Sequence, residues 1–156
     1  MKTALRMMIA MLALSTIAMG ADNLIGTWKY NTAKSQQPPG ASPVANLTTM
    51  YEAANGGMKL TGKGARVDGS KIDFVATFKY DGKKFPVTGS GLQYDTSAIK
   101  QVSANTYTAE RRKKDGKYHV TVQMVISADG KTMTQTMKGT DATGKPTSGV
   151  VVYERQ

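Results

Sequence analysis

Few residues of this sequence could carry acid–base or nucleophilic chemistry. His119 is the sole histidine, and the chain has no cysteine. A catalytic nucleophile needs a neighbouring base and a third group that orients this base, and the usual zinc sites need several imidazoles or thiolates. Asp68, Asp81, Asp115 and Asp129 each precede a glycine, which is typical of turn residues. We therefore expect no enzyme activity, no metal site and no cofactor.

The basic run Arg111–Lys114 is the strongest local charge feature. Arg111 falls on the same strand face as Tyr107 by alternation, so it is a candidate cation inside the fold. The alternative is that all four residues lie in solvent at the tip of a hairpin. His119 falls on the polar face of the next strand, and we expect it at the surface. An enzyme would instead need an acid–base pair inside the fold, with Glu110 and Arg111 as candidates.

Strands must position these residues, because turn signals and alternation dominate the sequence. Asp-Gly occurs at 68–69, 81–82, 115–116 and 129–130, mostly between segments in which apolar and polar residues alternate, which favours hairpins. Glycine is frequent, and beyond residue 20 leucine occurs four times only. The turns delimit ten predicted strands: 24–30, 46–53, 57–66, 71–80, 83–87, 96–102, 105–114, 117–126, 131–139 and 147–154.

Ten short strands joined by tight turns predict an all-β fold, an antiparallel up-and-down barrel of about 8 to 10 strands. Closure into a barrel removes the exposed edges of a sheet, whereas an open two-sheet sandwich is the alternative. Residues 31–45 contain three prolines and should form a long loop between the first two strands, without a helix. This loop could be a lid or a plain surface crossing.

The inward faces of the predicted strands supply the candidate ligand-binding residues. Aromatic rings and flexible methionines suit an adaptable apolar cavity with a few polar groups, although the same set could fill a dry core. The candidates are Tyr51, Phe74, Phe78, Tyr107, Arg111, Tyr118, Val122, Met124, Met133, Gln135, Met137 and Tyr153.

Residues 1–20 read as a signal peptide, with Lys2 and Arg6 before an apolar run and Ala18 and Gly20 at the spacing of a cleavage site. Cleavage after Gly20 would leave one domain, 21–156, and lower the net charge from +10 to +8. An exported domain without cysteine fits a bacterial periplasm, or secretion. We expect a monomer and no nucleic-acid partner, and the positive charge could support peripheral contact with anionic envelope surfaces.

Both ends of this domain resemble the calycin superfamily, which comprises lipocalins, fatty-acid-binding proteins and bacterial lipocalin-like relatives. Gly26-Thr27-Trp28 resembles the motif of the first strand, and 129–139 and 149–155 resemble the last two strands of fatty-acid-binding proteins. The resemblance implies that Trp28 plugs the closed barrel end beneath Arg155, and that Gly26 permits close approach there.

The chain also departs from the fatty-acid-binding pattern. That family anchors the ligand carboxylate with Arg-x-Tyr near the C-terminus; Tyr153 matches the tyrosine, but Val151 occupies the arginine position. The loop 31–45 replaces the helical lid of that family. The sequence thus predicts an exported, lipocalin-like barrel that binds a small apolar or amphipathic molecule, such as a lipid. The alternative is a cationic envelope interaction module with a filled core.

Overall fold

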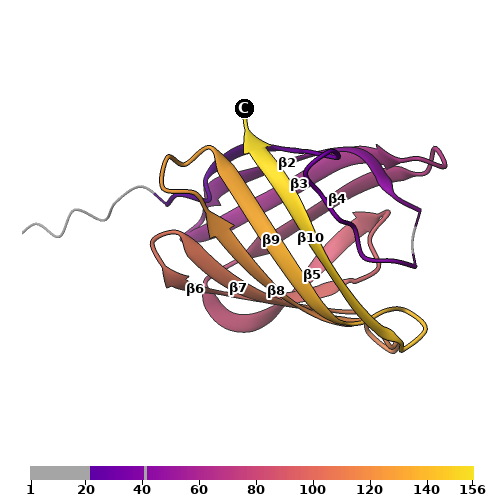
Figure 1. Cartoon of the computed structure of the whole chain (residues 1–156). Helices are drawn as coiled ribbons and strands as arrows, with labels where there is room; N and C mark the ends of the chain where they lie inside the picture. Colours follow the sequence, from indigo (N-terminus) through magenta and orange to yellow (C-terminus); the bar gives the residue numbers. More distant parts are fainter. Residues whose placement is uncertain (1–21, 41) are drawn as a thin grey trace, which may run out of the picture.

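The computed structural model describes residues 22–40 and 42–156, which form ten antiparallel strands (Figure 1). The predicted signal peptide lies outside these residues. The strands are β1 (Gly26–Tyr30), β2 (Val44–Ala54), β3 (Gly57–Arg66), β4 (Lys71–Phe78), β5 (Asp81–Ser90), β6 (Thr96–Ser103), β7 (Thr106–Arg112), β8 (His119–Ile126), β9 (Thr132–Thr140) and β10 (Pro146–Arg155). No helix among these residues is long and apolar enough to cross a membrane.

The sheet closes on itself. Each strand pairs with the next along the chain, and β1 also pairs with β10 in the register Trp28↔Arg155 and Tyr30↔Tyr153. This arrangement confirms the predicted up-and-down barrel, and the alternative of an open sandwich is wrong. Figure 1 shows the first and last strands side by side at this seam.

Alternation of apolar and polar residues sets which strand face is interior. In β4, Ile72, Phe74, Ala76 and Phe78 are buried while the residues between them are exposed. The same two-residue period buries four apolar residues of β8 and leaves the intervening ones near solvent. Because a shift by one residue would move every buried side chain into water, this pattern also fixes the strand register.

The fifth strand differs from the prediction. β5 runs over ten residues, Asp81–Ser90, whereas the sequence suggested only 83–87. The strand contains Pro86 and Gly89, two residue types that are uncommon within a strand. The ladder between β4 and β5 covers only Asp73–Ala76 with Val87–Ser90, so Pro86 lies outside it and needs no donor toward β4. Asp81-Gly82 opens the strand instead of forming the turn before it.

Trp28 and Arg155 meet at one end of the barrel. The Arg155 guanidinium carbon lies 4.2 Å from the centroid of the fully buried Trp28 ring. The guanidinium also donates to the backbone carbonyls of Asn23, Ile25 and Gly130, each at 2.6 Å. Gly26 has φ +138°, and any side chain there would collide with Arg155. One guanidinium thus joins the segment before β1, the β8–β9 turn and the last strand.

Arg155→Lys should destabilise the protein by about 2 to 3 kcal/mol, because an ammonium cannot reproduce three carbonyl contacts in a planar fork over an aromatic ring. Urea unfolding measures this loss. The matched control is Arg112→Lys, at a half-exposed arginine that pairs with an exposed glutamate; its effect should stay within about 0.5 kcal/mol. Equal losses in the two variants would contradict the bridging role of Arg155.

Candidate functional site

A cavity of about 150 Å³ lies in the half of the barrel away from Trp28. The loop between β1 and β2 and the loop between β5 and β6 both contribute to its wall. Seven of the residues proposed from the sequence line it: Tyr51, Phe74, Arg111, Tyr118, Gln135, Met137 and Tyr153. These seven residues come from five strands, β2, β4, β7, β9 and β10, and from the loop between β7 and β8.

The other interior candidates lie elsewhere. Phe78 and Met124 line a second void of about 30 Å³, which shares Tyr51 and Arg111 with the main cavity. Tyr107, Val122 and Met133 are fully buried and line neither space. The barrel is thus a filled core in one half and a hollow in the other, which combines the two possibilities that the sequence left open.

Arg111 points into the barrel from β7. Its guanidinium donates to Gln135 Oε1 at 3.0 Å and contacts Met137 Sδ at 3.9 Å. Its central carbon lies 5.2 Å from the centroid of the Tyr94 ring, which in turn stacks on Tyr118. Arg111 is therefore separate from the solvent-exposed residues 113–114 of the same basic run.

Three residues that line the cavity carry a buried hydroxyl oxygen with no hydrogen-bond partner among the described residues. They are Tyr30 on β1, Thr49 on β2 and Thr147 on β10, and each side chain is more than nine-tenths buried. Leaving a buried polar group unsatisfied costs about 1 to 3 kcal/mol. This cost marks the cavity as a place where protein atoms alone do not satisfy the polar groups.

These hydroxyl-bearing residues are not among the predicted site residues, although the sequence contains a signal for them. Thr49 precedes Tyr51 by two positions, Thr147 precedes Gly149 by two, and Tyr30 follows Trp28 by two. The two-residue period therefore places them on the inward faces. Threonine is equally common on the outward faces of this chain, so residue type alone does not distinguish the two environments.

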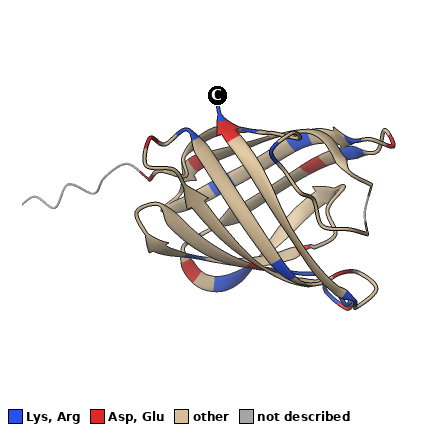
Figure 2. Ribbon diagram, in the orientation of Figure 1, with Lys and Arg blue, Asp and Glu red and all other residues tan. Residues whose placement is uncertain are grey.

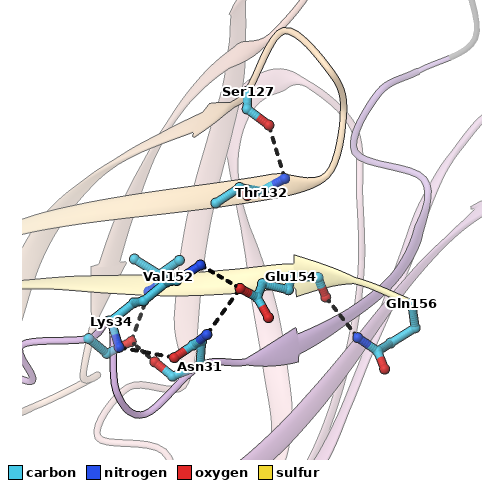
Figure 3. Close-up of polar contacts among 8 residues, drawn as sticks. Asn31, Lys34, Ser127, Thr132, Val152, Glu154 and Gln156 are labelled. Atoms are coloured by element: carbon cyan, nitrogen blue, oxygen red, sulfur yellow. Dashed lines mark hydrogen bonds and ion pairs between the residues drawn. The ribbon is translucent and has the colours of Figure 1, made fainter.

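The loop that follows β1 is fastened to β10. Figure 3 shows Asn31 and Lys34 together at Glu154, with bonds of 3.0 and 2.8 Å to the same carboxylate oxygen. These donors lower the pKa of the Glu154 carboxyl, Lys34 having the larger effect. The Val152 amide also donates to Ser35 Oγ at 2.9 Å. The first part of the loop therefore continues the seam between β1 and β10.

The second part of the loop covers the cavity. Gln36 exchanges two backbone hydrogen bonds with Val150 of β10, and the Gln37 side chain bonds both backbone groups of Val44. Pro38 and Pro39 then form part of the cavity wall. A proline-rich segment that hydrogen bonds fix at both ends thus covers the cavity. It stands where fatty-acid-binding proteins have a helical lid.

Gly149→Val should displace this cover, because a Cβ at Gly149 would lie 2.6 and 2.7 Å from two ring carbons of Pro38. Contacts this short cannot exist without movement of the backbone. Hydrogen exchange should show loss of protection at the amides of Gln36 and Val150, with the barrel amides of β3 and β8 unchanged. The control Ser148→Val changes an exposed neighbour. Retained protection at Gln36 would contradict the proposed packing.

Buried tyrosines surround both the cavity and the closed end. Burial raises the pKa of Tyr51 to about 12, against the opposing effect of the nearby Arg111 guanidinium. Burial, and next a hydrogen bond to Asp22, raise the pKa of Tyr80 and of Tyr107. The two phenols donate to Asp22 at 2.5 and 2.7 Å, which ties the start of the described chain to β4–β5 and β7.

These pKa values predict that the protein loses stability in base. The folded-state pKa of Tyr51 lies above its unfolded value of about 10, so unfolding releases a proton at high pH. The free energy of unfolding should therefore fall as pH rises from about 10 to about 12, by about 2 kcal/mol for Tyr51 alone. Urea midpoints against pH measure this fall. Tyr51→Phe should show a smaller fall, and an identical fall would contradict the assignment.

The two candidates for an acid–base pair, Glu110 and Arg111, point to opposite sides of β7. Glu110 is exposed, and it contacts Arg112 at 3.3 Å and His119 at 3.9 Å on the outer surface, while Arg111 points inward. Within residues 22–40 and 42–156, no three His, Asp or Glu side chains gather closely enough to hold a metal ion. Glu110 and Arg111 therefore do not form the acid–base pair that the sequence offered as an alternative.

Comparison with known proteins adds no family assignment. No protein-family model matches this chain, and no curated protein matches it in sequence. The closed ten-stranded antiparallel barrel is compatible with a calycin-like fold. Figure 2 shows Lys and Arg at several separate places of the described ribbon, on strands and on loops.

Proposed function

We propose that this barrel is a non-enzymatic binding protein that holds a small apolar or amphipathic molecule in its cavity. The observation that carries the proposal is the cavity itself, about 150 Å³ in volume, with apolar walls and a few buried polar groups. Binding sites for small molecules commonly combine these features, and a barrel of this size can enclose one ligand.

Two further features support this function. The loop between β1 and β2 covers the cavity and is held by hydrogen bonds to Val150 and Val44. Movement of this loop would let a ligand enter without any break in the pairing of the barrel strands. Methionine and aromatic side chains line the interior beside Val151, and such surfaces adapt to ligands of different shape. We further propose that the protein is an exported, calycin-like barrel, on the basis of its leader-like first 20 residues and its topology.

Titration with toluene and indole should test this function, because both are neutral and close in size to ligands of similar cavities. Nuclear magnetic resonance should show saturable shifts at Met137 and Val151, with a dissociation constant on the order of 1 mM or tighter. Val151→Phe should abolish uptake by filling the cavity, whereas Val125→Phe, at an outward position of β8, should not. Absence of saturable shifts would favour the alternative, a cationic envelope module whose partner dissociates at high salt.

A further inference from the structure

The charge balance of the cavity wall indicates what kind of ligand it accepts. No Asp or Glu of the described chain lies within 4.0 Å of the Arg111 guanidinium, whereas Arg112 beside it pairs with Glu110. A guanidinium stays charged at any physiological pH. A charge that is partly removed from water is unfavourable unless a counter-charge and hydrogen bonds compensate it. Gln135 Oε1 and the Tyr94 ring supply only partial compensation.

The N–H donors of the other arginine on the cavity wall already have partners in the protein. Arg66 donates to the backbone carbonyls of Ser42 and Gly91, and so joins β3 to the covering loop and to the β5–β6 loop. These two bonds fix the Arg66 guanidinium in the wall, whereas Arg111 has one oxygen partner among the described residues, Gln135 Oε1. The N–H donors left free on Arg111 match one carboxylate, and a second carboxylate would find no equally free arginine on the cavity wall.

The unpartnered hydroxyls add a second requirement. Tyr30, Thr49 and Thr147 are 6%, 5% and 7% exposed and line the same cavity as Arg111. A hydroxyl group both donates and accepts a hydrogen bond. A purely hydrocarbon ligand would leave all three groups unsatisfied, whereas a ligand with its own hydroxyl could satisfy at least one of them.

The size of the cavity limits the ligand further. A volume of about 150 Å³ accommodates one benzene-sized ring in a comparable apolar cavity, and a long acyl chain would not fit beside the filled half of the barrel. The stacked rings of Tyr94 and Tyr118, 6.2 Å apart, lie next to the Arg111 guanidinium. They offer aromatic surface to a flat ligand.

We propose that the ligand is a small aromatic monocarboxylate with a polar ring substituent, of the hydroxybenzoate type. Its carboxylate pairs with Arg111, with Gln135 beside it, and its substituent bonds the hydroxyl groups of Thr49, Thr147 or Tyr30. This inference rests on the proposed function and specifies its ligand class. Arginine recognises carboxylates well because its planar fork can offer two parallel N–H donors.

Calorimetry on the purified protein should compare 4-hydroxybenzoate, benzoate, toluene and decanoate at neutral pH. We expect benzoate to bind about tenfold tighter than toluene, 4-hydroxybenzoate at least about threefold tighter than benzoate, and decanoate more weakly than either. Arg111→Gln should reduce benzoate affinity about tenfold or more and leave toluene unchanged. The matched control Arg112→Gln should alter neither. Thr49→Val combined with Thr147→Val should bring 4-hydroxybenzoate close to the affinity of benzoate.

If Arg111→Gln does not fold, the pH dependence of benzoate binding to the unsubstituted protein provides a second test. Benzoate affinity should decline as pH falls below the carboxyl pKa of about 4, since the neutral acid gains nothing from Arg111, and toluene affinity should not follow it. If toluene binds saturably and benzoate binds no tighter, this inference is overturned and the proposed function stands. Decanoate binding tighter than benzoate would also overturn it. If none of the four compounds binds, the proposed function fails as well.

Discussion

The short seam between β1 and β10 is the constraint on which the rest of this structure depends. Only three residue pairs join the two strands, Trp28↔Arg155, Lys29↔Glu154 and Tyr30↔Tyr153. Without them the sheet would have two open edges and no enclosed interior. The chain reinforces the seam at both ends, through the Arg155 guanidinium on one side and through the loop residues bonded to Val150, Val152 and Glu154 on the other. The hydrogen bonds that extend this seam beyond β1 thus also hold the cover of the cavity.

The barrel interior has a packed half and a hollow half. Near Trp28 the barrel is packed with large side chains, and the carboxylate of Asp22 satisfies the two phenols that reach it. Toward the other end, Gln37 and Pro38 cover the space from above while no large side chain fills it. The domain has no disulfide, so the packed half supplies most of its stability. The hollow half can therefore contain polar groups that weaken packing.

The sequence was sufficient for the fold because the decisive signals are local. Asp-Gly turns and two-residue alternation specify strands and their inward faces, and alternating runs such as 71–80 and 117–126 could be assigned without knowledge of their partners. Prediction failed where a partner strand decides the outcome: β5 contains Pro86, which is tolerated because the pairing with β4 stops at Val87. The cover of the cavity was equally hidden, because hydrogen bonds between Gln36 and Val150 join residues far apart in the chain.

The candidate site was predictable in its apolar part and less so in its polar part. Large aromatic residues and methionine on an inward face are conspicuous, whereas Thr49 and Thr147 resemble the many outward threonines. Arg111 was ambiguous for a physical reason: a run of four basic residues normally indicates solvent, yet strand alternation sends every second side chain inward. The first residue of the run is still within β7, and the last two lie beyond its end at Arg112. The end of β7 therefore determines which residues of the basic run alternate between the two faces of the sheet. Arg111 lies before this end and reaches the cavity wall, whereas the residues beyond it lie in solvent.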